Sequence, residues 1–179
     1  RHLLVAITDE MTQLIDRSAG YWGTNPETAG FDLRSMLEEV AARYGGRGDA
    51  SRIAVDYRLD TPIVQGDSFI AIIGNLIDNA LRHAGPEANI IVICDADRRG
   101  RLRLTVEDNS TGIPRRLHRR IFRPGFRSVP TGDNHGIGLA YIRNTARRIG
   151  ARLRLDSRPG HGSRFILTFT PGQKHRPRK

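Results

Sequence analysis

Three polar side chains that could hold a charged ligand lie on one side of a long apolar stretch near the middle of the chain. When residues 66–84 are placed on a helix, Asn75, Asn79 and Arg82 fall with Asp78 in one arc of roughly 100°. Apolar residues fill most of the remaining circumference. Burying carboxamides or a guanidinium without partners would cost about 1–3 kcal/mol each. The pattern therefore predicts a mostly buried helix whose polar side faces a ligand, a polar neighbour or, in the plainer interpretation, solvent.

A second candidate follows the alternating stretch 102–107, which predicts a strand. There the chain continues as Asp108-Asn-Ser-Thr-Gly112-Ile113. A carboxylate at the end of a strand can accept a hydrogen bond from an exocyclic amine such as that of adenine, and Gly112 would let the backbone approach a flat ring closely. The alternative, an ordinary Asp-Asn turn, stays open on this pattern alone.

Two phenylalanines interrupt the basic, Gly/Pro-rich stretch from 108 to about 135. Phe122 and Phe126 lie within residues 121–128 together with arginines, among them Arg127. Aromatic side chains in a long loop favour a segment that folds over a ligand, and an arginine there could bind phosphate through two hydrogen bonds. Anchoring of the loop to the core by Phe122 is compatible with the same pattern.

Glycines precede a predicted helix at 138–149. Free N–H groups and the dipole at a helix N-terminus favour phosphate oxygens, which makes residues 136–138 a candidate phosphate cradle, although Gly-x-Gly alone is weak evidence. The chain has no Gly-x₄-Gly-Lys-[Ser/Thr] loop, and a loop rather than a strand precedes the glycines. Walker-type and Rossmann nucleotide sites are therefore disfavoured.

The order of these features resembles the ATP-binding catalytic domain of sensor histidine kinases, in the superfamily shared with gyrase, the Hsp90 chaperones and MutL. The family's Asn-Leu-Leu-x-Asn-Ala box is similar to residues 75–80, its Phe box to 121–128, and its second Gly box to 136–139. Its closing Gly-x-Gly-Thr-x-Phe is similar to residues 160–165. The resemblance extends from about Phe31 to Pro171.

The resemblance implies ATP and Mg²⁺ as the bound groups. Asn79 would coordinate Mg²⁺, and Asn75 would lie beside the phosphates. Arg82 and His83, at positions that are commonly Lys and Tyr in the family, would reach the triphosphate. Asp108 would accept a hydrogen bond from the adenine amino group, aided by Gly112 and by Ser163 through water. The other implied nucleotide-binding residues are Ile113, Phe126, Arg127, Gly136, Ile137, Gly138 and Leu139.

The same resemblance implies that Asn79 and Arg127 are the catalytic residues, with Arg127 in the lid as a partner of the γ-phosphate. One departure from the family pattern is Ser110, which stands where the family usually has Gly. A side chain and a hydroxyl at that position are expected to tighten the turn or to narrow the adenine site.

The predicted elements follow one another as hairpins rather than as regular βαβ units, which favours an α+β fold. We expect a two-layer sandwich of about three helices on one face of a mixed, mainly antiparallel sheet, which is the Bergerat-type ATP-binding fold. The expected strands are 53–57, 61–64, 90–94, 102–107, 153–155 and 165–169. The expected helices, besides the two above, are 3–19 and 33–41.

The composition fits a folded domain of ordinary size, with 179 residues, an apolar fraction of 38% and a formal charge of +10. No window approaches eighteen consecutive apolar residues, so no membrane-spanning helix is expected. The lone Cys94 excludes an internal disulfide and is expected in the core. Because the arginines are dispersed and only the tail is densely basic, no specific nucleic-acid binding is expected.

For the domain organisation, we expect residues 1–22 to be the second helix of a dimerisation and phosphoacceptor hairpin with its linker. Residues 23–172 would form the ATP-binding catalytic domain, and 173–179 a flexible basic tail. The acceptor helix is then missing, and His2, at the start of the chain, is a poor candidate for the acceptor.

The resemblance implies transfer of the γ-phosphoryl group to a histidine on that hairpin, with a response regulator downstream. We expect a homodimeric parent that can be anchored in the membrane, with this part on the cytoplasmic side and monomeric by itself. Two alternatives remain on the same fold. One is an anti-sigma-factor-type serine kinase or partner-switching regulator. The other, suggested by Ser110 and His83, is a degenerate module that binds ATP without transferring phosphate.

Overall fold

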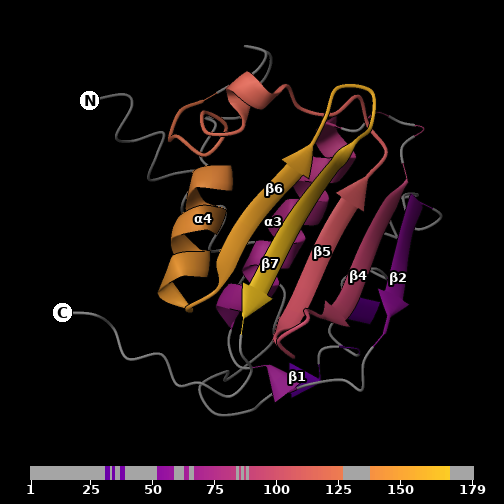
Figure 1. Ribbon diagram of the computed structural model, residues 1–179, viewed down its shortest axis with the longest axis vertical. Helices are drawn as coiled ribbons and strands as arrows, with labels where there is room; N and C mark the ends of the chain where they lie inside the picture. The colour runs from indigo at the N-terminus through magenta and orange to yellow at the C-terminus, as the bar shows by residue number, and fades with distance from the viewer. Residues whose placement is uncertain are drawn as a thin grey trace.

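The computed structural model describes residues 31–32, 34, 37–38, 52–58, 63–64, 67–83, 85, 87, 89–126 and 138–169. Within these residues, a five-stranded sheet is backed by two long helices (Figure 1). The strands, in their spatial order, are β2 (Ile53–Tyr57), β4 (Ile90–Ala96), β5 (Leu102–Asp108), β7 (Ser163–Phe169) and β6 (Arg152–Ser157).

The sheet is mixed but mainly antiparallel. Strands β2 and β4 are parallel, whereas the pairs β4–β5, β5–β7 and β6–β7 are antiparallel. A separate two-stranded ribbon pairs β1 (Phe31–Asp32) with β3 (Ile63–Val64). A single turn of 3-10 helix, η2 (Arg115–Leu117), follows β5.

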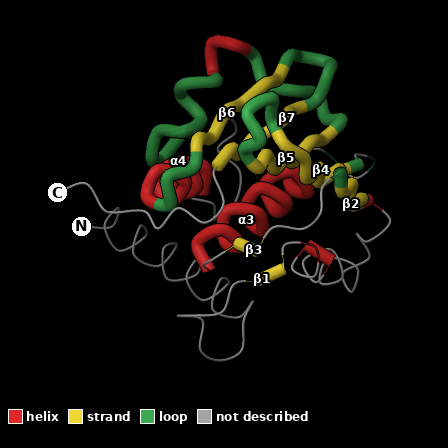
Figure 2. Tube along the Cα trace, turned by 60° about the horizontal axis from the view of Figure 1, so that its bottom comes forward, coloured by secondary structure: helices red, strands yellow, loops and turns green. Residues whose placement is uncertain are grey.

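Helices α3 (Asp67–His83) and α4 (Gly138–Arg148) cover the same face of the sheet, as Figure 2 shows. Apolar residues recur at helical spacing in both, so each has a face that must be removed from water. The strands alternate instead, and in β5 the residues Leu102, Leu104 and Val106 all point to the helical layer and are buried. The apolar faces of the two helices and of the sheet therefore pack against each other and form one core between the layers.

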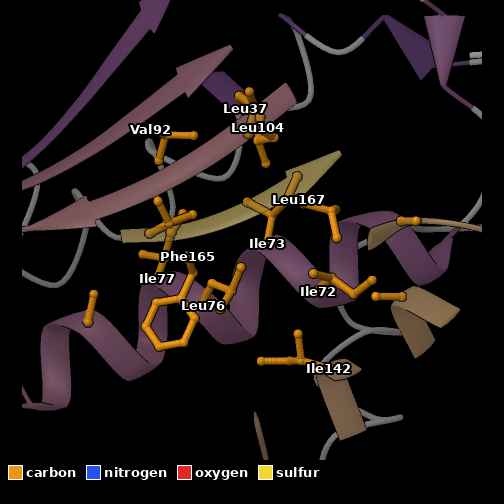
Figure 3. Close-up of a cluster of buried hydrophobic side chains, with 14 of the residues drawn as sticks. Leu37, Ile72, Ile73, Leu76, Ile77, Val92, Leu104, Ile142, Phe165 and Leu167 are labelled. Atoms are coloured by element: carbon orange, nitrogen blue, oxygen red, sulfur yellow. The ribbon is translucent and has the colours of Figure 1, made fainter. Parts of the chain in front are cut away.

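In the core, side chains of α3 pack against those of β5 and β7 (Figure 3). Ile73, Leu76 and Ile77 are at most 1% exposed, as are Phe165 and Leu167 on the facing strand. Burying side chains of this size stabilises a fold by about 1.5–3 kcal/mol each, before the entropy of ordering them is counted. This packing fixes the position of α3 on the sheet.

The opposite face of the sheet is charged, and several of its charges are paired. The Arg103 guanidinium donates to Asp95 on the neighbouring strand, with Nε 2.6 Å from Oδ1. Arg164 donates to Glu107 at 2.8 Å across the β5–β7 pair. These pairs are partly exposed, so each adds little stability. The pairs neutralise part of the charge on this face of the sheet, where basic and acidic side chains lie next to each other.

The fold confirms the predicted class, helices on one face of a mixed and mainly antiparallel sheet. The central helix begins and ends within a residue of its expected limits, and α4 matches 138–149 closely. Strands β4 and β6 extend one or two residues further than expected at their ends. The expected strand at 61–64 exists only as β3, which pairs with β1 outside the main sheet.

Cys94 lies in the core, as predicted, and burial raises the pKa of its thiol to about 11. Of the helix expected at 33–41, the structure describes Arg34, Leu37 and Glu38, which are helical, with Leu37 buried. The helix expected at 3–19 and the tail at 173–179 lie outside the described residues. Among the residues described, no helix is long and apolar enough to cross a membrane.

Candidate functional site

One end of the sheet collects the polar residues that the sequence singles out. Strand β5 ends there at Asp108, and the register places Ser163, the first residue of β7, directly opposite it. Strand β6 ends at the same edge with Ser157, paired with Ser163. Because α4 leads through a short turn into the far end of β6, the N-terminal end of α4 lies toward this edge too (upper part of Figure 1).

Asp108 is buried, with 6% of its surface exposed, and it directs the turn that follows it. Its Oδ1 accepts a hydrogen bond from the Ser110 N–H at 3.1 Å. The Ser110 hydroxyl in turn accepts one from the Gly112 N–H at 3.3 Å. Ser110 therefore tightens the turn, which is one of the two effects expected of it. A carboxylate offers about four acceptor positions, so Asp108 retains the capacity to bind a further donor.

The turn at 109–113 packs directly against the turn at 158–162. Gly112 and Gly162 both have positive φ, 72° and 70°. A Cβ on Gly112 would overlap the Arg158 carbonyl, and one on Gly162 would overlap the Asp108 carbonyl. The Gly160 N–H also donates to the Thr111 carbonyl at 2.7 Å. Gly112 is thus required by its conformation and by this contact; its approach to a flat ring stays a prediction.

Ser157 joins the two turns through one buried hydroxyl. Its Oγ accepts from the Ile113 N–H at 2.7 Å and donates to the Gly162 carbonyl at 2.7 Å. The Ser163 Oγ lies 3.1 Å away, within hydrogen-bonding distance. Ser157 and Ser163 are 5% and 4% exposed, so water cannot replace these bonds easily. The hydroxyl fixes the position of Ile113, which is one of the predicted site residues.

Past Ile113 the chain is held by a side chain and by the core. His118 Nε2 lies 2.9 Å from the Ile113 carbonyl oxygen, within hydrogen-bonding distance. Ile121 and Phe122 are buried, and the Phe122 ring meets Phe165 edge-on at a centroid distance of 6.4 Å. Phe122 therefore anchors this segment to the core. Phe126 packs on the core as well, with the Arg120 guanidinium 5.4 Å from its ring centroid.

The polar side of α3 is present as expected. Asn75, Asp78 and Asn79 are half-buried and Arg82 is exposed, whereas Leu76, Ile77 and Ala80 between them are buried. The Asn75 amide donates to the Ala71 carbonyl one turn earlier, at 2.7 Å. This bond uses the NH₂ group and leaves the carboxamide oxygen as an acceptor, which is the atom that a hard cation or its water shell would bind.

The end of α3 lies within electrostatic range of Asp108. Much of His83 is exposed, but the surrounding protein desolvates its ring enough to lower the pKa, and the charge of Arg82 lowers it further. The Asp108 carboxylate acts in the opposite direction and raises it. The end of α3 and the end of β5 therefore influence each other electrostatically, and the net effect holds the pKa of His83 below its ordinary value.

A family model describes this combination of elements. Residues 65–173 match the family of histidine kinase-, DNA gyrase B- and HSP90-like ATPases. The matched part contains α3, α4, the whole of β4 to β7 and the two interlocked turns. The chain belongs to this ATPase family.

Curated relatives carry the names of sensor proteins and sensor-like histidine kinases. The chain is 33% identical over 146 residues to the alginate biosynthesis sensor protein KinB of Pseudomonas aeruginosa, covering 79% of this chain and 24% of that protein. It is 30% identical over 152 residues to the sensor-like histidine kinase SenX3 of Mycolicibacterium smegmatis, covering 80% of this chain and 39% of that protein. The chain thus spans well under half the length of these relatives.

Solved structures agree on the fold. The catalytic domain of the histidine kinase ThkA superposes with a TM-score of 0.69 at 22% identity, covering 81% of this chain and 96% of that one. Full-length ShkA in complex with AMPPNP superposes with a TM-score of 0.70 at 22% identity, covering 96% of this chain and 36% of that one. The fold of this ATPase domain is that of histidine kinase catalytic domains.

Within the ATPase fold, the structure brings Asp108, Gly112, Ile113 and Ser163 together at one edge of the sheet, with His83 within electrostatic range of Asp108. Gly138 and Leu139 begin α4, and Leu139 packs on the core. Arg127, Gly136 and Ile137 lie outside the described residues, so their predicted roles stay predictions.

Sequence reasoning missed Ser157 and His118, the two side chains that bind the backbone of Ile113. Ser157 is the last residue of a strand, just before the Gly-rich turn, and it pairs with Ser163. Its place beside that turn is the only sequence feature that could have indicated its role. His118 sits in a run of arginines and carries no comparable signal.

The electrostatic contacts of His83 can be tested by titrating its imidazole with NMR. Its pKa should lie below the ordinary 6.5, should rise in Arg82→Gln and should fall further in Asp108→Asn. Because the folded protein binds this proton less readily than the unfolded chain, the free energy of unfolding should be highest above pH 6.5 and should fall as the pH drops below it. An unchanged pKa in both variants would contradict the proximity of these groups.

The role of Ser157 can be tested by equilibrium unfolding in urea. Ser157→Ala leaves the Ile113 N–H and the Gly162 carbonyl without their buried partner, so it should cost about 1–3 kcal/mol of stability. Ser110→Ala is the matched control, because its single bond of 3.3 Å lies in a partly exposed turn and its loss should cost far less. Equal losses in the two variants would refute the joining role of Ser157.

Proposed function

We propose that this chain is the nucleotide-binding catalytic domain of a sensor histidine kinase and that it binds ATP with Mg²⁺. The observation that carries the proposal is the buried Asp108 at the end of β5, facing Ser163 and lying within electrostatic range of the polar end of α3 in a chain of this ATPase family. The complex of ShkA with AMPPNP, on the same fold, supports an adenine nucleotide as the ligand.

Asp108 is the group suited to recognise adenine. A buried carboxylate accepts hydrogen bonds only, so it selects a base with an exocyclic amine over one with a carbonyl at that position. The Ser163 hydroxyl, 3.1 Å from the Ser157 hydroxyl, lies opposite Asp108 and could bind the same base through a water molecule. The interlocked turns hold these two groups in place.

The residues at the polar side of α3 suit Mg²⁺ bound together with phosphate. No cluster of three or more His, Cys, Asp or Glu side chains in the described ranges could hold a metal alone. Mg²⁺ keeps much of its water and takes few ligands from the protein when phosphate oxygens supply the rest. Carboxamide oxygens of Asn79 and Asn75 fit that limited role, and we assign Asn79 as the protein ligand, with Arg82 and His83 toward the triphosphate.

The reaction is phosphoryl transfer to a histidine of a helical hairpin in the same parent protein. The bond between the γ-phosphorus and the β–γ bridging oxygen breaks, a bond from phosphorus to an imidazole nitrogen forms, ADP leaves and the imidazole proton is released. Positioning and charge stabilisation supply most of such catalysis. In the chain, this assigns Asn79 to the cation and Arg127 to the γ-phosphate, with Gly136, Ile137, Gly138 and Leu139 at the phosphates and Phe126 in the lid.

Residues 23–172 are the extent that we propose for this domain, with a hairpin segment at 1–22 and a basic tail at 173–179. The curated relatives of P. aeruginosa and M. smegmatis are named as a sensor protein and a sensor-like histidine kinase, which supports a response regulator as the downstream partner and a dimeric parent.

Asn79→Ala tests the metal assignment. Titration with AMPPNP in a calorimeter should show Mg²⁺-dependent tightening in the wild type, and this tightening should drop by about tenfold or more in the variant, equivalent to ~1.4 kcal/mol. Asn144→Ala, an exposed asparagine on the other helix, is the matched control and should behave as wild type. Full Mg²⁺ dependence in Asn79→Ala would refute the assignment.

The transferred group can be identified by its stability in acid. Incubation with a hairpin from the parent protein and radiolabelled ATP should label the hairpin, and the label should be lost in acid and retained in base, as expected of phosphohistidine. An acid-stable label would instead identify a serine kinase. Tight ATP binding without any transfer would identify a module that binds nucleotide only.

A further inference from the structure

The segment that leads away from the Asp108 turn is strongly and uniformly positive. Residues 109–126 contain five arginines and no aspartate or glutamate. All five arginines are exposed. We call these residues the basic stem: Arg115, Arg116, Arg119, Arg120 and Arg123.

The basic stem is held in a fixed shape. Backbone hydrogen bonds run from Leu117 N–H to Pro114 at 2.8 Å, from Ile121 N–H to Leu117 at 2.9 Å and from Arg123 N–H to Arg120 at 2.9 Å. Between the arginines, Leu117 packs on the core and Ile121 and Phe122 are buried. The Arg143 guanidinium of α4 lies 5.8 Å from the Phe122 ring centroid. Since the apolar residues face inward, the five guanidinium groups are displayed outward from a fixed backbone.

The positive charges of the basic stem are not neutralised by carboxylates, unlike those of several arginines on or next to the strands. Arg58, Arg101, Arg103 and Arg164 each pair with a carboxylate within 2.8 Å. In the parts of the chain that the structure describes, no carboxylate lies within ion-pair distance of the basic stem; its one recorded charge contact is that of Arg120 with the Phe126 ring. Five like charges so close together repel one another, which favours the approach of an anion.

The basic stem lies at the edge of the sheet that carries the candidate site. It begins two residues after Ile113, whose N–H is bound to Ser157 and whose carbonyl is bound to His118. In Figure 1 the salmon-coloured helical turn, η2, lies beyond the tip of β6, at the same end of the molecule as the start of α4. A triphosphate that approaches this edge therefore passes through the field of these arginines before it binds.

We propose that the basic stem is an electrostatic capture surface, which attracts the phosphates of the nucleotide and speeds its association with the site at the end of β5. This inference rests on the proposed nucleotide binding. Fixed charges around a site can raise the association rate of an oppositely charged ligand by 10- to about 1,000-fold at low ionic strength, without touching the bound ligand. The surface acts on the charge of the ligand and not on the base.

The test measures association and dissociation rates by stopped flow, using fluorescent N-methylanthraniloyl derivatives of AMPPNP and of adenosine with the whole chain. Replacing all five arginines by Gln should slow association of the triphosphate about tenfold or more at low salt, and the difference should shrink as the Debye length falls from about 20 Å to about 4 Å. Dissociation should stay unchanged, as should both rates for the uncharged adenosine derivative.

Two further variants serve as controls. Replacing the five arginines by Lys keeps the charge and should preserve the wild-type association rate even if the Gln variant folds poorly. Arg98→Gln with Arg99→Gln removes two exposed charges from the β4–β5 turn at the opposite end of the sheet and should leave association nearly unchanged.

An association rate that is unchanged in the Gln variant would overturn the inference, and the positive surface would then be assigned to an acidic macromolecule. Faster dissociation with unchanged association would also overturn it, because the arginines would then hold the bound ligand. If the wild type binds neither derivative, the proposed nucleotide binding itself fails. If it binds both and the charge has no effect, only the capture surface fails.

Discussion

The close approach of two backbones at one end of the sheet is the constraint on which the candidate site depends. The turns at 109–113 and 158–162 touch so closely that Gly112 and Gly162 have no room for a side chain. Because this contact is made by backbone atoms, it cannot adjust as a flexible side chain would. It holds the end of β5, where Asp108 lies, in register with the start of β7 and Ser163. The buried Ser157 hydroxyl then joins both turns through its bonds to Ile113 and Gly162.

The burial of α3 explains how a polar ligand site can lie on a core helix. Ile72, Ile73, Leu76 and Ile77 are almost fully buried, and at about 1.5–3 kcal/mol each they outweigh the cost of partly burying Asn75 and Asn79. The polar side is only half-buried, so its groups keep access to water or to a ligand. Packing thus determines where the helix lies, and the amide groups occupy the part that packing leaves uncovered.

Charge is distributed unevenly between the two surfaces of this domain. On the open face of the sheet, arginines alternate with carboxylates and form pairs such as Arg103–Asp95 and Arg164–Glu107. On the segment after Asp108 the arginines have no acidic neighbours in the described residues. A net charge of +10 is therefore not a uniform property of the molecule. Five of its arginines lie on one short segment, at 115–123, that contains no carboxylate.

The sequence by itself determined the class of fold, the central helix with its polar side, and the position of Asp108 at a strand end. These features depend on local periodicity and on short motifs, which can be recognised along the chain. It did not determine that the strand near Ile63 pairs with β1 outside the main sheet, because strand pairing is a contact between distant segments. Nor did it indicate Ser157 or His118. The Ser157 bond to Ile113 joins residues 44 apart, and only the packing of the two turns brings them together. The sequence thus supplies the candidate groups of the site, whereas the tertiary structure decides which residues hold them in place, since that support comes from contacts that no local pattern encodes.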